Sequence, residues 1–348
     1  MHLGNGLQIM QKSKVIHVLP GMNIGGVEVG IQRSFRELNT KISYEIFSIR
    51  GAGNIPIPTI GWISLFKCCI NSSSRPDVVV SSLWYGHILG GIVAILCGAK
   101  WVPFFHSASS KGIIRSAVLF ISCYLCKNAF FDSEATYDYF KDYVTGNYKI
   151  IPYRFQSSQS NWDINTLFKY DCIFVGRISP VKRIDLLLNF IQIMQSLRFN
   201  LKVIVVLSGS EQDEINFKKQ VESNNLQIDI KFNQSQVEVE KLLYCSKLYL
   251  SFSDYEGFSM STVDAISYGC IPVVRPVGQI GKYVTDDGGI IISDTSQNGL
   301  LDVALKCQSL LNNETLMQNM SDVSIGNINQ FSFYVDAFLD GIDILINK

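Results

Sequence analysis

Two acids stand eight positions apart in the hydroxyl-rich stretch DYEGFSMSTVDAISYG (254–269), namely Glu256 and Asp264. The apolar runs KLYLSFS (247–253) and IPVVR (271–275) on either side predict two buried strands. Glu256 is then expected on the loop at the carboxyl end of a strand, and Asp264 inside the next helix. In an open parallel sheet, ligands bind at that edge.

The helix between these strands is expected to begin near Ser259 and to end at Gly269, because glycine is the usual helix-stopping residue. A second polar cluster lies in CIFVGRISPVKRIDLLLNF (172–190), where Ser179 suits a helix N-cap and Pro180 the first helical position.

Three cations gather at that predicted helix start, where the helix dipole disfavours positive charge by about 0.3–1 kcal/mol each. They are Arg177, Lys182 and Arg183. Two interpretations stay open. An anion bound by the cations and the loop amides would resolve the conflict, as helix N-termini attract phosphate. Alternatively, the long side chains turn out to water.

Two weaker signals lie in the first half of the chain. The loop MNIGG (22–26) follows a predicted strand, and Gly25 and Gly26 would let a ligand approach the backbone closely. It is not GxGxxG, so binding of a nicotinamide dinucleotide is poorly supported. His106 ends the predicted strand WVPFFH (101–106) and is either a hydrogen-bonded structural residue or a catalytic one.

The elements that must position these residues alternate between strand and helix, which is the signature of βαβ units. The expected strands are 15–20, 77–82, 101–106, 128–133, 172–176, 202–209, 228–232, 247–253, 271–275 and 288–292. Helices are expected at 27–38 and 331–346, and the polar stretch 151–171 reads as a linker. A chain of 348 residues is long for a single core. The pattern therefore predicts two doubly wound α/β domains in tandem, with a cleft between them.

Charge is unevenly divided between the halves of the chain. Residues 1–155 contain 15 Lys and Arg against 8 Asp and Glu, and the remainder contains 15 against 22. A basic first half either faces an anionic partner or reflects chance. The nine cysteines lie mostly in apolar runs, which favours a reducing compartment. The CxxC of Cys123 and Cys126 is better explained by buried packing than by a metal or redox site.

Two segments bear on membranes, whereas no secretory signal is visible because the first apolar run, 15–20, is too short. Residues 78–99 carry no formal charge over 22 positions and are interpreted as strand, turn and buried helix, with a membrane span as the alternative. The segment 111–127 has an apolar core flanked by Lys111, Arg115 and Lys127. It is suited to rest on an anionic membrane surface.

The motifs GRISPVK (176–182) and YEGFSMSTVDA (255–265) together resemble the retaining glycosyltransferases of family 4, which have the GT-B fold. Other pieces agree in order, namely the glycine pair at 25–26, a strand-ending histidine, DSEATYDYF (132–140) and Ile-Pro at 151–152. The similarity covers most of residues 14–292. It implies two Rossmann-like domains facing a central cleft: an acceptor-binding domain at 1–155, a nucleotide-sugar-binding domain at 156–330, and a C-terminal helix within 331–348 packing back on the first domain.

The resemblance also implies roles for individual residues. Arg177 and Lys182 would hold the donor diphosphate, and Glu256 the hydroxyls of the donor sugar. Asp264 stands where the family has a second Glu that contacts the ribose, and His106 would touch the transferred sugar. Backbone near the donor would come from Gly25, Gly26, Gly257, Phe258 and Ser259. Cations and helix ends can stabilise a nucleoside diphosphate leaving group, so neither a metal nor a cofactor is expected.

Four positions depart from the family pattern. Asp264 is one methylene shorter than Glu, and IPYRF (151–155) lacks the Asn-Gly that commonly follows Ile-Pro. Ser210 replaces a common second glycine, and FNQ (232–234) lacks the glycine usual near the nucleobase. None of these changes touches Arg177, Lys182 or Glu256.

The resemblance therefore implies a metal-independent, retaining, hexosyl-type transferase that uses a nucleotide sugar, with UDP favoured over GDP, and forms an α-linkage. Its acceptor is expected to be a lipid-linked surface glycan such as lipopolysaccharide O-antigen or capsule. The enzyme would be cytoplasmic and peripheral at the inner face of the membrane, without a nucleic-acid partner. Alternatives are a nucleotide-sugar epimerase with two similar domains and a degenerate protein that binds nucleotide sugars without turnover.

Overall fold

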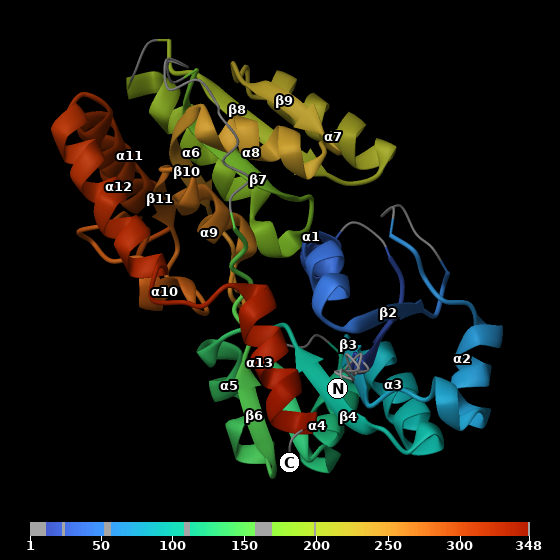
Figure 1. Cartoon of the computed structure of the whole chain (residues 1–348). Coiled ribbons are helices and arrows are strands. Elements are labelled where there is room, and N and C mark those ends of the chain that lie inside the picture. Colours follow the sequence, from blue (N-terminus) through green and yellow to red (C-terminus); the bar gives the residue numbers. More distant parts are fainter. Residues whose placement is uncertain are drawn as a thin grey trace, which may run out of the picture.

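The fold consists of two α/β domains, each built on a parallel six-stranded sheet (Figure 1). The computed structural model describes residues 12–22, 25–51, 57–107, 112–156, 169–197 and 200–346. The predicted alternation of strand and helix is confirmed, as are the ten expected strands, to within a few residues at their ends.

The N-terminal sheet has the strand order β2-β1-β3-β4-β5-β6. Its order reverses beside β1, which creates the switch point where ligands bind in such sheets. The strands are β1 (Lys14–Leu19), β2 (Ser43–Ser48), β3 (Val78–Ser82), β4 (Lys100–Phe105), β5 (Asn128–Phe131) and β6 (Asn147–Ile150). Strands β2 and β6 are absent from the sequence-based prediction.

The C-terminal sheet has the order β12-β11-β10-β7-β8-β9, the order of a Rossmann domain, with its switch point between β7 and β10. Arg177 ends β7 and Glu256 follows β10, so both cluster residues come to that point. The strands are β7 (Tyr170–Arg177), β8 (Val203–Ser208), β9 (Asp229–Phe232), β10 (Ser246–Ser251), β11 (Ile271–Val274) and β12 (Ile290–Ile291).

Helices cover both faces of the N-terminal sheet. One face packs against α1 (Gly26–Lys41) and α13 (Tyr334–Ile346). The other packs against α2 (Trp62–Ile70), α3 (Trp84–Cys97), α4 (Ile113–Leu125) and α5 (Glu134–Phe140). In the C-terminal domain, α6 (Ile184–Leu197), α7 (Glu211–Ser223) and α11 (Gln297–Leu311) cover one face, whereas α8 (Gln236–Tyr244) and α9 (Met260–Ser267) cover the other. Helices α10 (Ile280–Tyr283) and α12 (Glu314–Ile328) lie near α9.

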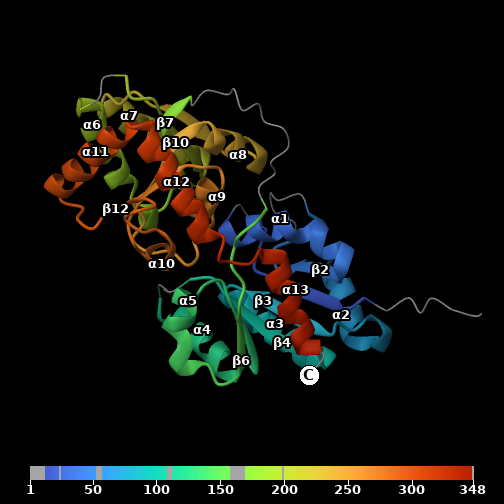
Figure 2. The same ribbon diagram turned by 60° about the vertical axis from the view of Figure 1, so that its left-hand side comes forward.

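The chain crosses between the domains twice. Residues 151–155 leave β6, and α13 returns from the C-terminal domain to lie along the N-terminal one, as both views show (Figures 1 and 2). Phe338 of α13 contacts the rings of Tyr44 and Phe130. One buried apolar cluster consequently runs through both domains, so we expect them to unfold together.

Two local expectations are wrong. Ser179 and Pro180 begin a short 3₁₀ turn (Pro180–Lys182) rather than α6, and the Ser179 side chain makes no capping hydrogen bond. Arg183 then adopts a left-handed conformation (φ 49°), which separates the turn from the helix that starts at Ile184. Helix α3 is not fully buried, because a row of its isoleucines is exposed.

The cysteines form no disulfide bonds, and most of their side chains are buried. All nine cysteines are free, and burial raises the pKa of the Cys123 and Cys126 thiols to about 12. Among the described residues, no helix has the length and apolar character needed to cross a membrane.

Candidate active site

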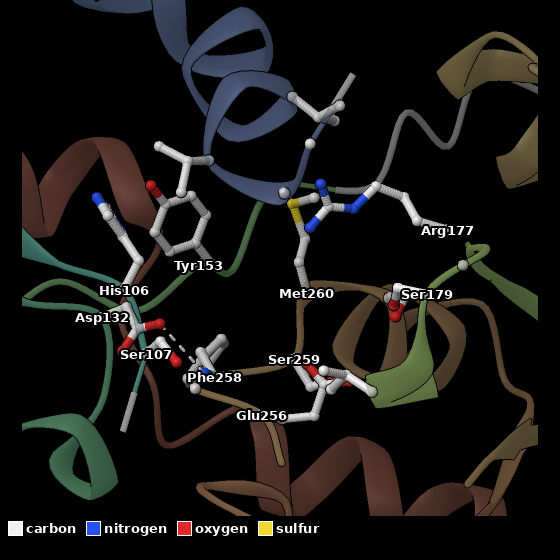
Figure 3. Close-up of a pocket in the computed structure, with 18 of the residues that line it drawn as sticks. His106, Ser107, Asp132, Tyr153, Arg177, Ser179, Glu256, Phe258, Ser259 and Met260 are labelled. Atoms are coloured by element: carbon white, nitrogen blue, oxygen red, sulfur yellow. Dashed lines mark hydrogen bonds between the residues drawn. The ribbon is translucent and has the colours of Figure 1, made fainter. Parts of the chain in front are cut away.

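A cavity of about 520 Å³ lies between the domains, at the carboxyl ends of both sheets. Figure 3 shows His106, Asp132 and Tyr153 on one side of it, Arg177 and Ser179 on the other, and Glu256 and Ser259 below. The residues expected from the sequence to contact a donor all line this cavity: Gly25, Gly26, His106, Arg177, Lys182, Glu256, Gly257, Phe258, Ser259 and Asp264. The resemblance implied that these residues gather around one donor, and the structure brings them together.

Lys182 and Glu256 form an ion pair inside the cavity. The Lys182 Nζ donates to Oε1 of Glu256 at 2.6 Å, and the two side chains are 18% and 14% exposed. Burial lowers the pKa of Lys182, but the neighbouring Glu256 carboxylate more than offsets this and leaves the pKa raised. The lysine therefore stays charged, held by the acid that the resemblance assigns to the sugar.

The other two cations of the cluster differ from Lys182. Arg183 is held by Asp185 at 2.7 Å and by Asp254 at 3.3 Å, so it braces the loop before Glu256. Arg177 is exposed at the end of β7 and reaches toward the glycine loop of the opposite domain. Of the two open interpretations, an anion site fits Arg177 and Lys182, whereas Arg183 serves the structure.

Close approach of the two domains explains one of the glycines, because a Cβ on Gly257 would lie 2.2 Å from Oδ2 of Asp132. A Cβ on Gly25 would instead meet Oε2 of Glu28 in its own domain at 2.4 Å, whereas Nη1 of Arg177 lies at an ordinary contact distance of 3.5 Å. A Cβ on Gly26 would meet open space.

Asp132 lines the cavity, although no role was expected for it. It follows β5, is buried, and its Oδ2 accepts a hydrogen bond of 3.4 Å from the Phe258 amide across the domain boundary (Figure 3). Burial raises its pKa to about 6, despite hydrogen bonds from Ser133 and Thr136. Only its place in DSEATYDYF, at the end of the predicted strand 128–133, pointed to it.

Asp264, the expected ribose-binding acid, is engaged by a cation from the other domain. The Arg33 Nη1 on α1 donates to Oδ2 of Asp264 at 2.6 Å, and its Nη2 lies 3.7 Å from Oε1 of Glu240. The three side chains are 5–10% exposed, and the guanidinium also stacks on Phe155 at 4.4 Å. Burial raises the pKa of Asp264 although Arg33 opposes the shift.

His106 lies on the N-terminal side of the cavity at the end of β4. Its Nε2 is 2.8 Å from Oγ of Ser82, and its ring packs between Phe104 and Tyr153. Burial lowers its pKa well below the usual range, with the nearby His17 and His87 adding to the effect. The imidazole is therefore neutral. In the described part of the chain, no group of three or more His, Cys, Asp or Glu side chains is arranged to hold a metal ion.

Comparison with known proteins places these motifs in context. Residues 165–324 match the family model described as Glycosyl transferases group 1. Among curated proteins, a glycogen synthase of Thermotoga petrophila is 30% identical over 115 residues, which are 32% of this chain and 23% of that protein. The poly(ribitol-phosphate) alpha-N-acetylglucosaminyltransferase of Staphylococcus aureus is 29% identical over 157 residues, 44% of this chain and 31% of that protein. The matches thus span less than a third of the length of these relatives.

Solved structures resemble the chain over a greater length. HepE of Anabaena in complex with UDP-glucose has a TM-score of 0.77 at 15% identity, covering 96% of this chain and all of that one. TarM of Staphylococcus aureus has a TM-score of 0.63 at 19% identity, covering 82% of this chain and 59% of that one. With its two Rossmann-like sheets around a shared cavity, the chain therefore has the GT-B fold, and its residues 165–324 are similar to group 1 glycosyl transferases.

Proposed function

We propose that the protein transfers a hexosyl group from a nucleotide sugar to a glycan, with retention and an α-linked product. The observation that carries the proposal is the interdomain cavity, where Arg177, Lys182 and Glu256 of one domain face His106 of the other. The switch points of both sheets lie at this cavity. Residues 165–324, which match the family model, contain Arg177, Lys182 and Glu256.

The chemistry of the cavity suits departure of a nucleoside diphosphate. Negative charge grows on the diphosphate as the glycosidic bond breaks, and fixed cations stabilise it most where water is excluded; loss of one such group typically costs about 10²–10³ in kcat. Lys182 is already charged and partly buried there. Glu256 would exchange Lys182 for sugar hydroxyls when the donor enters. No metal ion is needed for these roles.

The finer assignments rest on the names of similar proteins. A UDP-sugar is favoured because HepE and TarM were solved with UDP or UDP-glucose. Retention and an α-linkage agree with the alpha-transferases among the relatives. A lipid-linked acceptor agrees with the GDP-mannose:cellobiosyl-diphosphopolyprenol alpha-mannosyltransferase of Xanthomonas campestris, which is 26% identical over 94 residues, 26% of this chain and 25% of that protein.

The test is nucleotide release from a panel of UDP- and GDP-sugars, with and without a membrane lipid extract as acceptor. We expect release from one donor, stimulation by the extract, and an α-linked product by NMR. Glu256→Gln should lower turnover about ten- to a hundredfold, because hydrogen bonds to a charged group contribute about 1.5–3 kcal/mol. The matched control is Glu238→Gln, because Glu238 is a half-exposed acid on α8 that pairs with Lys241 away from the cavity.

Each alternative outcome identifies another function. Conversion of the sugar without any acceptor would support an epimerase. Donor binding without turnover, under every acceptor, would refute the transferase and support a nucleotide-sugar-binding protein.

The same proposal includes docking of the N-terminal domain on an anionic membrane at the cytoplasmic side. Helices α2, α3 and α4 pack side by side on the part of the N-terminal domain that lies away from the C-terminal domain (Figure 1). Many of their apolar residues are exposed, and we infer that these form one apolar face. This face consists of Trp62, Ile63, Phe66, Ile70, Tyr85, Ile88, Ile92, Ile95, Leu96, Ile113, Ile114, Ile121, Tyr124 and Leu125.

Charge complementarity favours a lipid surface over a protein as the partner of this face. Between residues 57 and 131 the sequence has six Lys or Arg and a single acid, Asp77. Arg115 lines the cavity, and the Lys100 Nζ donates to the Leu345 carbonyl. The exposed cations that remain among the described residues are therefore Lys67, Arg75 and Lys127. A basic residue near an anionic bilayer contributes about 1 kcal/mol, and exposed apolar side chains insert at the headgroup level. The expected segment 111–127 is thus only part of the face, and its Lys111 lies outside the described residues.

Vesicle sedimentation tests the docking. We expect binding to vesicles containing phosphatidylglycerol, weaker binding to phosphatidylcholine alone, and loss of binding in Ile95→Asp/Ile113→Asp. Leu305→Asp is the matched control, because Leu305 is an exposed apolar residue on α11 of the other domain. If vesicles never bind and the double variant instead dissociates a dimer, the apolar face joins two copies and the lipid proposal is wrong.

A further inference from the structure

A chain of buried hydrogen bonds runs from the core of the N-terminal domain to the cavity. The Tyr44 hydroxyl lies 2.6 Å from Nδ1 of His17, and Nε2 of His17 lies 2.7 Å from Oγ of Ser82. The same Oγ lies 2.8 Å from Nε2 of His106. Four neighbouring strands supply the chain: Tyr44 comes from β2, His17 from β1, Ser82 from β3 and His106 from the end of β4.

The direction of these bonds follows from the hydrogens available. Among the described residues, His17 is the sole hydrogen-bond partner of the Tyr44 hydroxyl, so the buried hydroxyl hydrogen is satisfied only when it is donated to Nδ1 of His17. Burial lowers the pKa of His17 to about 3, so the ring is neutral and its one proton sits on Nε2. That Nε2–H donates to Ser82, and the Ser82 hydroxyl donates in turn to Nε2 of His106.

The proton of a neutral His106 must then be on Nδ1. The structure leaves this nitrogen buried and without a hydrogen-bond partner among the described residues. If all three hydrogen bonds ran the other way, the Tyr44 hydroxyl hydrogen would have no acceptor, and Tyr44 is buried in the core where no ligand can reach it. In the assigned direction the unsatisfied donor belongs to His106, a residue that lines the cavity, where a bound molecule can accept from it.

We infer that Tyr44, His17 and Ser82 are positioning residues that fix His106 in the Nδ1–H tautomer, so that it donates a hydrogen bond to a hydroxyl oxygen of the bound sugar. The contact with sugar rests on the proposed function, whereas the tautomer does not. Ser82 transmits the orientation because a hydroxyl can accept from one ring and donate to the next.

A neighbouring pair of groups provides an internal comparison. Ser81 accepts from the Trp101 indole at 2.9 Å and lies 3.0 Å from Nδ1 of His87. A hydroxyl oxygen can accept twice, so these contacts leave both directions open for the bond between Ser81 and His87. Ser81 has no link to His106 and therefore serves as a control for the chain that ends there.

Long-range ¹⁵N–¹H NMR of histidine-labelled protein tests the tautomer without any substrate. His106, assigned by its loss in His106→Asn, should show a protonated Nδ1 in wild type. Tyr44→Phe removes the end donor and should shift His106 toward a mixture, whereas Ser81→Ala should leave it unchanged. A protonated Nε2 on His106 in wild type would overturn the inference even if Tyr44→Phe failed to fold.

Turnover then tests the use of that proton. The amide nitrogen of Asn occupies the place of Nδ1 and that of Gln the place of Nε2, so His106→Asn should retain more activity than His106→Gln, by about tenfold, the value of one hydrogen bond. Tyr44→Phe and Ser82→Ala should each lower kcat/KM about three- to tenfold. Equal loss in the Asn and Gln variants, with the predicted NMR tautomer present, would refute the sugar contact alone. Absence of turnover in wild type would instead reject the proposed function.

Discussion

The ion pair between Arg33 and Asp264 allows a sharp test, because it joins the two domains through buried charges. Arg33→Met keeps the stem over Phe155 but removes the charge that faces both Asp264 and Glu240. Two carboxylates then remain buried without their cation. Removing one partner of a buried pair costs about 3–5 kcal/mol, so we expect a loss of that size in the free energy of unfolding at pH 7 to 8.

Asp264→Asn should cost less than Arg33→Met, because Arg33 keeps Glu240 as a partner. The pair Arg33→Met/Asp264→Asn should recover part of the loss and give a coupling energy of about 1 kcal/mol or more in a double-mutant cycle. The pKa of Asp264 is already raised in the folded protein and rises further without Arg33. Protonation then relieves the stranded charge, so the cost of Arg33→Met should shrink as the pH falls through that pKa.

Urea unfolding, followed by circular dichroism, measures these differences. A single transition is expected, because one apolar cluster runs through both domains. Lys218→Met is the control, since Lys218 forms an exposed pair with Glu214 that contributes about 0.5 kcal/mol or less. If Arg33→Met costs no more than this control, or the cycle shows no coupling, the interdomain pair does not hold the domains together.

Three further predictions follow from the packing. Asp132→Asn should be more stable than wild type above pH 6, by about 3 kcal/mol, and equally stable below pH 4. The reason is that the pKa of Asp132 rises from 3.8 in the unfolded chain to about 6 in the folded protein, so folding disfavours the ionised carboxylate. Thermal melts across this pH range measure the difference. Gly257→Ala should abolish turnover by pressing on Asp132, and adding Asp132→Ala should restore part of it, as nucleotide release will show. Gly341→Leu on α13 should cost about 1–3 kcal/mol in urea, because even a Cβ there lies 2.9 Å from the Phe130 ring.

Much of the fold is predictable from periodicity because its strands are buried on both faces. Val78, Val79 and Val80 in β3 are all fully buried, so the strand appears as an unbroken apolar run. Strand β6 has no such run, since its residues are at most half-buried at a sheet edge, and it was missed. The start of α6 was misplaced because Ser and Pro favour any helical turn, whereas the break depends on the φ angle of Arg183.

The sequence predicts those site residues that follow the ends of strands. It does not predict ion pairs between residues that are far apart in the sequence. Glu256 and Lys182 each follow a strand, and the switch point brings them together. Arg33 and Asp264 are 231 positions apart, and no spacing rule joins them. Helix α3 is apolar all round, so its periodicity could not tell that Ile95 faces outward.

The two ion pairs in the cavity differ in how a nucleotide sugar can exchange with them. Lys182 and Glu256 hold each other, and a donor offers a phosphate to the first and sugar hydroxyls to the second, so neither is stranded. A ribose offers hydroxyls to Asp264 but no negative charge to Arg33. Arg33, however, keeps Glu240 at 3.7 Å. The shorter side chain of Asp264 can therefore leave Arg33 for the ribose without leaving a buried cation unpaired. Glu240→Gln should consequently weaken donor binding more than Glu238→Gln, although neither Glu240 nor Glu238 lines the cavity. Equal donor affinity in the two variants, measured by calorimetry, would show that Asp264 stays with Arg33 when the donor binds.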